Sequence, residues 1–278
     1  MIAPAIAAPP ARASTGDIDT TMPDHISPTA ARLYLSCSLK FYFERVLEIK
    51  KPAAPGLHLG KAVHAALQAF HLARWRGGHD SPEAVEQSYR DAFWRLEREE
   101  GPVGFADGAE REKSLDAGLR VVRAYLESPE ALKAKPVGVE VYLSERIPGL
   151  PVPLSGAIDL VQSDLAPVDF KSAAARPDPE QAAFENELQL VSYQLLIEAT
   201  AGRTPPSLNL VFLVKTKVPQ VVRVKVPPAE DGRKDRAVAM LNAAVDGIAE
   251  KRFHPAPGMQ CSWCGYRQEC MLWEVEEI

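Results

Sequence analysis

The 278-residue sequence contains no apolar run that approaches the length of a membrane span. Its first ten residues, Met-Ile-Ala-Pro-Ala-Ile-Ala-Ala-Pro-Pro, lack a basic segment and are interrupted by prolines, so they do not resemble a signal peptide. These absences predict a cytoplasmic protein with no membrane partner.

Cysteine is scarce, with four residues in the whole chain. Because cytoplasmic thiols stay reduced, four cysteines are better explained as metal ligands than as disulfides. Cys261, Cys264 and Cys270 form a C-x2-C-x5-C run after a stretch rich in proline and glycine, and Cys37 remains to supply a fourth ligand. Zinc and a [4Fe-4S] cluster both accept four cysteines, and spacing alone separates them poorly.

The chain also lacks a net positive charge. Its formal charge of -5 argues mildly against a nucleic-acid partner, which favours a basic surface. Residues 201–252 nevertheless carry more basic than acidic side chains, while Glu274, Glu276 and Glu277 add acidic charge at the C-terminus. The basic segment indicates either a basic groove on an acidic protein or a solvated charged face.

The pattern of apolar residues predicts how the chain is organised. Residues 1–24 are rich in Ala, Pro, Ser and Thr and are expected to be a disordered tail. Residues 25–278 are expected to form a single domain with a helical part (27–130), an α/β core (136–252) and a cysteine segment (253–272, together with Cys37). Helices are predicted at 27–46, 59–75, 81–100, 110–127, 185–200 and 231–251. Strands are predicted at 137–143, within a hairpin at 152–171, and at 207–215 and 219–226, with a polar loop at 172–183. This order of elements predicts an α/β fold with a central mixed sheet flanked by helices.

The hairpin carries the most informative polar residues. Asp159 lies on its first strand, and Asp169 and Lys171 lie on its second strand, where residues two apart share a face. Two adjacent carboxylates repel each other until a cation or a proton arrives, and Mg²⁺ or Mn²⁺ is the usual cation. The alternative is an exposed hairpin with a surface ion pair.

Three further positions extend this pattern. His64 lies on a predicted helix, where it is either a ligand or a hydrogen-bonded core residue. Gln189 and Tyr193 are four residues apart and therefore share a helix face, although the tyrosine could simply pack there. Glu140, on the first strand, either extends the acidic site or points outward.

Asp159 followed by Asp169-Phe170-Lys171 resembles the core of the PD-(D/E)xK nuclease superfamily. Gly60-x-x-x-His64 and Gln189-x-x-x-Tyr193 look like elements of its RecB-like branch. The four cysteines look like the iron-sulfur version of that branch, which includes AddB-type nuclease domains and CRISPR-associated exonucleases. The resemblance covers about residues 27–272 and implies a restriction-endonuclease-like core with an N-terminal helical elaboration and a Cys-rich C-terminal segment.

The resemblance also implies roles for individual residues. The Mg²⁺ or Mn²⁺ ligands would be His64, Asp159, Asp169 and the carbonyl of Phe170. Lys171 would activate water, while Gln189 and Tyr193 would position the lysine or the strand. A structural [4Fe-4S] cluster would be bound by Cys37, Cys261, Cys264 and Cys270.

The function that follows is a metal-dependent DNA exonuclease acting on single-stranded ends and leaving 5′-phosphates. Its role would be in recombination, repair or CRISPR adaptation, with a helicase or a recombination or CRISPR protein as a partner. The main alternative is a DNA-end binding or assembly subunit with little activity alone. A zinc-stapled regulator is a third possibility, but the sequence has no recognisable DNA-reading helix.

Overall fold

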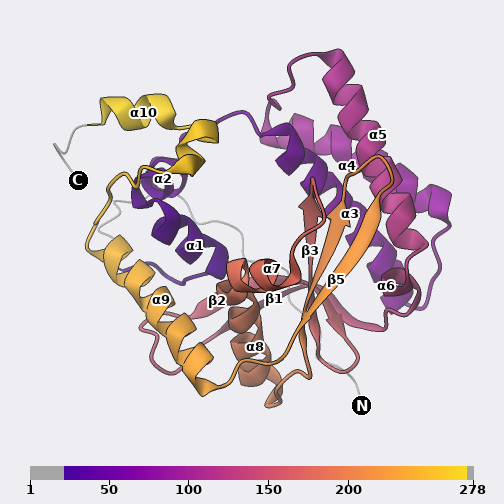
Figure 1. The fold of residues 1–278 in the computed structure, drawn as a ribbon. Helices are drawn as coiled ribbons and strands as arrows, with labels where there is room; N and C mark the ends of the chain where they lie inside the picture. Colours follow the sequence, from indigo (N-terminus) through magenta and orange to yellow (C-terminus); the bar gives the residue numbers. More distant parts are fainter. Residues whose placement is uncertain (1–21, 274–278) are drawn as a thin grey trace.

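The structure, a computed structural model, describes residues 22–273. Most of the predicted tail and the three acidic residues at the C-terminus lie outside the described residues. Within residues 22–273, five strands form one sheet: β1 (Pro136–Glu145), β2 (Leu154–Gln162), β3 (Pro167–Ala173), β4 (Leu208–Val214) and β5 (Gln220–Val226) (Figure 1). Their spatial order follows the sequence, and every neighbouring pair is antiparallel except β3 and β4, which are parallel. The prediction of a mixed sheet flanked by helices is confirmed.

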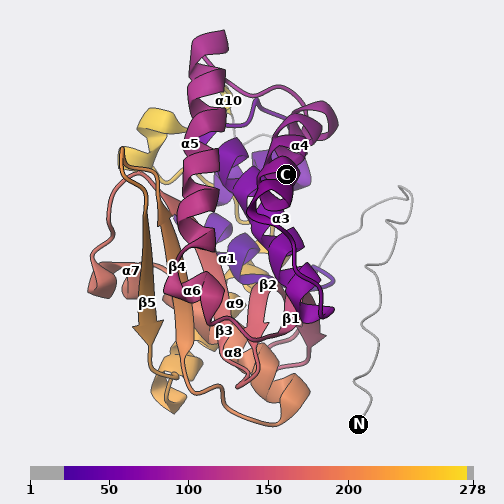
Figure 2. The same ribbon diagram turned by 90° about the vertical axis from the view of Figure 1, so that its right-hand side faces the viewer.

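Helices cover both faces of the sheet, as the burial of the strands requires. On one face lie α3 (Pro55–Trp75), α4 (Pro82–Glu100) and α5 (Gly108–Leu126), followed by the short α6 (Pro129–Leu132) (Figure 2). The other face is covered by α1 (Pro28–Ser36), α8 (Glu187–Ala201) and α9 (Asp231–Ala249). Every residue of β4 is buried, whereas β5 alternates buried and exposed residues, as expected for a strand at the edge.

The connection from β3 to β4 contains more helix than the sequence predicted. A parallel pair needs a crossover, and α7 (Pro179–Glu185) and α8 together provide it. The prediction of a polar loop up to residue 183 is therefore wrong in its second half. The side chain of Asp178 accepts a hydrogen bond from the Gln181 amide and Pro179 occupies the first turn, so the helix begins there.

The predicted helix at 27–46 is interrupted at Cys37. This residue has an extended backbone (φ -167°, ψ 103°) and separates α1 from α2 (Ser38–Phe41), which continues into a π-helical turn, η1 (Tyr42–Val46). The interruption lets the Leu39 amide donate to the His254 carbonyl at 3.0 Å and lets the Ser38 hydroxyl accept from the His254 amide at 2.9 Å. The N-terminal helices are thereby joined to the segment before η2 (Met259–Trp263) and α10 (Arg267–Leu272), the two short helices that carry the other cysteines.

None of the helices within residues 22–273 is both long enough and apolar enough to cross a membrane.

Candidate active site and cysteine pocket

The two predicted acidic residues lie where β2 and β3 separate. These strands pair only at Leu160 with Val168 and at Val161 with Pro167, so Asp159 and Asp169 face each other just beyond the last pair. The Asp159 carboxylate accepts a hydrogen bond from the Phe170 amide at 2.7 Å. The Asp159 side chain thus accepts the hydrogen bond that a backbone carbonyl of β2 would accept if the pairing of β2 with β3 continued. The separation of the two strands opens space beside both carboxylates.

Asp169 is almost fully buried, with its side chain 5% exposed. Its Oδ1 accepts a hydrogen bond from Gln189 Nε2 at 2.8 Å. Its Oδ2 lies 2.8 Å from Lys171 Nζ, but the angles are not those of a hydrogen bond, so this oxygen has no hydrogen-bond donor among the described residues. Burial raises the pKa of Asp169, and the charge of Lys171 offsets this only in part.

Gln189 connects the groups of the site. Its Oε1 accepts from Lys171 Nζ at 2.7 Å, and its Nε2 also donates to the Tyr193 hydroxyl at 2.7 Å. The Tyr193 hydroxyl in turn donates to the Ala157 carbonyl at 2.8 Å, and the residue is 3% exposed. This burial favours a positioning role for Tyr193 over direct contact with a strand.

His64 and Glu140 approach the pair of aspartates from other elements. His64, on α3, places Nδ1 3.4 Å from Asp159 Oδ1. Burial alone would lower the pKa of His64, but the hydrogen bond and the charge of Asp159, with the charge of Asp169, outweigh it and the pKa is raised. Glu140 is exposed but lines the same space, which agrees with the alternative that it extends the acidic site. Its φ of +50° is strained for a residue other than glycine, and burial together with Asp159 raises the pKa of its carboxyl.

These residues line one cleft of about 830 Å³ between α3, α4, α8 and the ends of β2, β3 and β4. The cleft contains every predicted residue of the catalytic and metal sets. It also contains residues that the sequence did not single out, among them Arg95 on α4, Ser172 on β3 and Lys215 after β4. No local spacing links these three to the hairpin, because only the fold brings their elements together.

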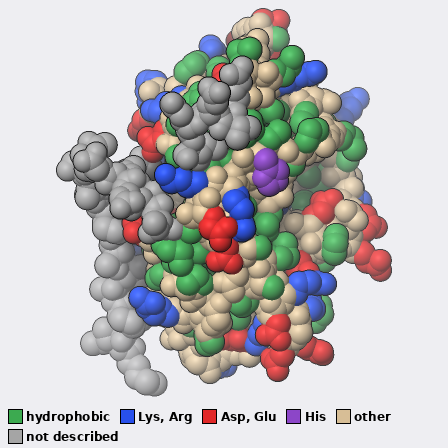
Figure 3. All heavy atoms as spheres, turned by 90° about the vertical axis from the view of Figure 1, so that its left-hand side faces the viewer, with side chains coloured by type: hydrophobic (Ala, Val, Ile, Leu, Met, Phe, Trp, Pro, Cys, Tyr) green, Lys and Arg blue, Asp and Glu red, His purple; other side chains and the backbone are tan. Residues whose placement is uncertain are grey.

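Several basic residues of the segment at 201–252 form ion pairs. Arg233 and Arg236 both contact Glu187, and Lys234 lies 2.8 Å from Glu198. On the face shown in Figure 3, the visible basic and acidic side chains are interspersed. These paired residues agree with the alternative of a solvated charged face for part of the segment.

As the side chains stand, no three His, Cys, Asp or Glu residues between 22 and 273 are arranged closely enough to hold a metal ion. The ion pair of Lys171 with Asp169 occupies part of the predicted ligand set. The donors themselves suit a hard divalent cation, because Asp169 Oδ2 is buried without a hydrogen bond and lies across from Asp159.

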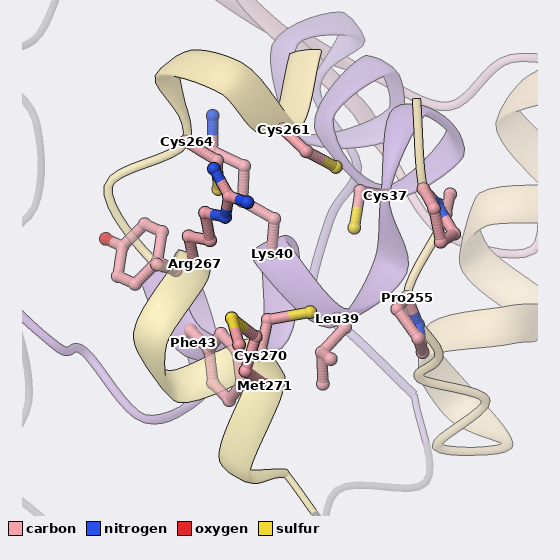
Figure 4. Close-up of a pocket in the computed structure, with 13 residues that line it drawn as sticks. Cys37, Leu39, Lys40, Phe43, Pro255, Cys261, Cys264, Arg267, Cys270 and Met271 are labelled. Atoms are coloured by element: carbon pink, nitrogen blue, oxygen red, sulfur yellow. The ribbon is translucent and has the colours of Figure 1, made fainter. Parts of the chain in front are cut away.

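The four cysteines line a separate cavity of about 220 Å³ between α2 and the C-terminal helices (Figure 4). Around them the pocket is mostly apolar, with Leu39 and Phe43 from the N-terminal side. Burial raises the pKa of the Cys270 thiol, and the other three cysteines raise it further. The Tyr266 hydroxyl donates to the Ile49 carbonyl at 2.9 Å and holds the C-terminal segment in place.

Comparisons with known proteins identify the family of the chain. The family model of the PD-(D/E)XK nuclease superfamily matches residues 25–271, so the chain belongs to that superfamily. A solved structure from Eubacterium rectale, described as a "putative exonuclease", has a TM-score of 0.57 at 12% identity and covers 92% of this chain and 90% of its own. It shows a shared fold. A second structure, SSO0001, covers 86% of this chain and 95% of its own at 14% identity, with a TM-score of 0.36. No curated protein gives a significant sequence match.

Proposed function

We propose that the chain is a metal-dependent DNA exonuclease of the RecB-like branch, acting on single-stranded ends and leaving 5′-phosphates. The observation that carries the proposal is the opposition of Asp159 and Asp169 at the point where β2 and β3 separate, with Lys171 beside Asp169 in an open cleft. Membership of a nuclease superfamily supports the reaction class. The strand preference and the products are part of the proposal.

His64, Asp159, Asp169 and the Phe170 carbonyl would hold Mg²⁺ or Mn²⁺. Such an ion supplies charge neutralisation at the phosphodiester and lowers the pKa of bound water. A nitrogen ligand such as His64 suits Mn²⁺ better than Mg²⁺.

The remaining groups of the site act on the nucleophile. Lys171 would orient the attacking water and, as the neutral amine, accept a proton from it; its Nζ is held by Gln189 Oε1 at 2.7 Å. Tyr193 would fix Gln189 through their hydrogen bond. In-line attack on phosphorus forms the new P–O bond and breaks the bond to the 3′ oxygen, which takes up a proton to become a hydroxyl, so the phosphate stays on the 5′ side.

The cysteine pocket would bind a [4Fe-4S] cluster. The shared cavity of Cys37, Cys261, Cys264 and Cys270 supports a thiolate centre, and its apolar lining suits a shielded cluster. Since Cys37 precedes α2, Cys261 lies in η2 and Cys270 lies in α10, the cluster would join the N-terminal helices to the C-terminal segment and would be structural. A helicase, recombination or CRISPR protein as partner stays a prediction.

The test is digestion of end-labelled single- and double-stranded DNA with Mg²⁺, Mn²⁺ or chelator. Lys171→Ala and Asp159→Asn should each lower metal-dependent cleavage at least about 100-fold, because general catalysis and charge stabilisation contribute on that scale. Asn at position 159 can still accept the hydrogen bond from the Phe170 amide, so this variant tests charge and not the local fold.

Lys225→Ala and Asp235→Asn are matched controls on exposed positions and should cut at the wild-type rate. Wild-type cleavage by either active-site variant would eliminate the mechanism. Binding of DNA ends that persists in chelator, without release of nucleotides in Mn²⁺, would favour the alternative of a binding or assembly subunit.

A further inference from the structure

Of the lysine and arginine residues that line the cleft in the described part of the chain, one has no carboxylate partner. The cationic side chains that line it are Lys61, Arg95, Lys171 and Lys215. The first three lie within 3.0 Å of a carboxylate oxygen, from Glu100, Glu99 and Asp169 respectively. Among the residues that the structure describes, Lys215 has no carboxylate and no side-chain hydrogen bond. Because a half-buried ammonium without a counterion is unfavourable, this position is suited to an anion from outside the chain.

The surroundings of Lys215 make this position still more favourable for an anion. A Cβ placed on Gly56 would lie 3.7 Å from Lys215 Nζ, so the ammonium lies against the first turn of α3. That helix starts at Pro55, and Ala54 before it provides no side-chain cap for the first amides. The positive end of a 21-residue helix therefore adds to the charge of Lys215. An anion bound here would be attracted both by the Lys215 ammonium and by the N-terminal end of α3.

Ser172 adds an unused hydrogen-bond donor at the same corner. Its Oγ is buried and has no hydrogen-bond partner among the described residues. It lies beside α3, 3.6 Å from a Cβ placed on Gly60. Ser172 pairs with Leu213, two residues before Lys215, so both side chains project toward the α3 face of the sheet. An anion between α3 and the ends of β3 and β4 could therefore accept from a hydroxyl and an ammonium together.

The site at Lys215 and Ser172 lies apart from Lys171 and Asp169, which would face the scissile bond. Lys171 pairs with Phe212 on β4, and Lys215 is three residues further along the chain. At about 3.3 Å per residue, this places the two backbones roughly 10 Å apart along the sheet. This separation leaves room for a phosphate at Lys215 that is different from the one that Lys171 and Asp169 face.

We propose that Lys215, with Ser172 and the first turn of α3, binds a second phosphate of the nucleic-acid strand, either a backbone diester or a terminal monoester, and so sets how the strand lies across the cleft. This inference rests on the proposed nuclease function. It assigns Lys215 to strand positioning and leaves the bond-breaking step to the aspartates and Lys171.

The test compares Lys215→Met, which keeps the aliphatic stem, with Lys215→Arg, which keeps the charge. Lys217→Ala, on the same loop and exposed, is the matched control. On single-stranded DNA, Lys215→Met should raise KM at least about 10-fold with kcat changed less than about 2-fold, since a charged hydrogen bond contributes on this scale. Lys215→Arg should recover most of the loss, and Lys217→Ala should match the wild type.

Binding in chelator provides a readout that does not need cleavage. The slope of log K against log salt concentration should be shallower by about 0.7 in Lys215→Met, the value expected for one lost phosphate contact on a single strand. A scan with one neutral methylphosphonate linkage at successive positions should find one linkage that weakens the wild type but not Lys215→Met. If only a 5′-phosphorylated end is sensitive to the variant, the ligand is the terminal phosphate.

The outcomes separate the two proposals. If Lys215→Met keeps the wild-type KM and salt slope while Lys171→Ala is inactive, the phosphate site is overturned and the nuclease function stands. If the wild type binds DNA but does not cut it, the nuclease function fails, and the salt slope still decides the role of Lys215. Absence of any DNA binding by the wild type overturns both.

Discussion

His71 should make the stability of the protein depend on pH in a predictable direction. It is 1% exposed, its Nε2 lies 2.6 Å from the Tyr125 hydroxyl, and its Nδ1 has no partner among the described residues. Burial, with a smaller contribution from Arg74, lowers the pKa of His71 to about 3. In the unfolded chain the pKa would return to about 6.5.

The sign and the size follow from this difference. Between pH 6.5 and pH 3 the unfolded chain binds one more proton than the folded chain, so the free energy of unfolding falls as the pH falls. From pH 7.5 to pH 5.0 the loss from His71 alone is about 2 kcal/mol. Asp169 and Glu140 act in the opposite direction, because their raised pKa values stabilise the fold at low pH and this contribution is lost as the pH rises.

The assay is urea unfolding at pH 7.5 and pH 5.0 for the wild type and His71→Gln, which does not titrate but can still bond to Tyr125. The drop in the free energy of unfolding should be about 2 kcal/mol smaller in His71→Gln than in the wild type, because the contributions of Asp169 and Glu140 cancel in the comparison. His79→Gln, at an exposed histidine, should keep the pH dependence of the wild type. Equal drops in His71→Gln and the wild type would refute the argument from burial.

Two other substitutions test the packing and the cysteine pocket. Gly118→Ala would place a Cβ 2.0 Å from the hydroxyl of the buried Tyr89 and should lower the free energy of unfolding by about 1–3 kcal/mol. Its control is Gly108→Ala, where the added Cβ meets open space. In the same urea titration, the free energy of unfolding of Gly108→Ala should stay within about 1 kcal/mol of the wild type. Cys37→Ser should abolish stoichiometric iron in anaerobically purified protein. It should also lower the free energy of unfolding by as much as about 5 kcal/mol, because the metal centre would no longer close the long loop between Cys37 and the other cysteines. Ser36→Ala is its neighbouring control, and stoichiometric zinc in the wild type would contradict the cluster.

The sequence predicted the parts of the site that depend on short spacings. Asp169 and Lys171 are two apart on a strand, and Gln189 and Tyr193 are four apart on a helix, so each pair shares a face wherever the element forms. The boundaries of β4 and β5 were also close to those predicted, because their apolar runs are bounded by turn residues.

The features that were missed depend on contacts between distant elements. The break at Cys37 is not encoded by a helix-breaking residue in Ser36-Cys37-Ser38, and it exists because Leu39 and Ser38 bond to His254. The sequence left two alternatives for Glu140, and strand alternation could not decide between them, because its left-handed backbone departs from a regular strand. Lys215 looked like one of many basic residues in its segment, and only its place in the cleft, where Lys61, Arg95 and Lys171 each contact a carboxylate, singles it out.

The joining of the first helices to the last segment has a consequence for biosynthesis. Ser38 and His254 are 216 residues apart, and at 5–20 residues per second a ribosome needs on the order of 10 to 40 s to make the chain between them. During that interval Cys37 has been synthesised but Cys261, Cys264 and Cys270 have not. A metal centre in this pocket can therefore be completed only on a chain whose translation has passed Cys270, so truncated products would be left unmetallated and open to degradation.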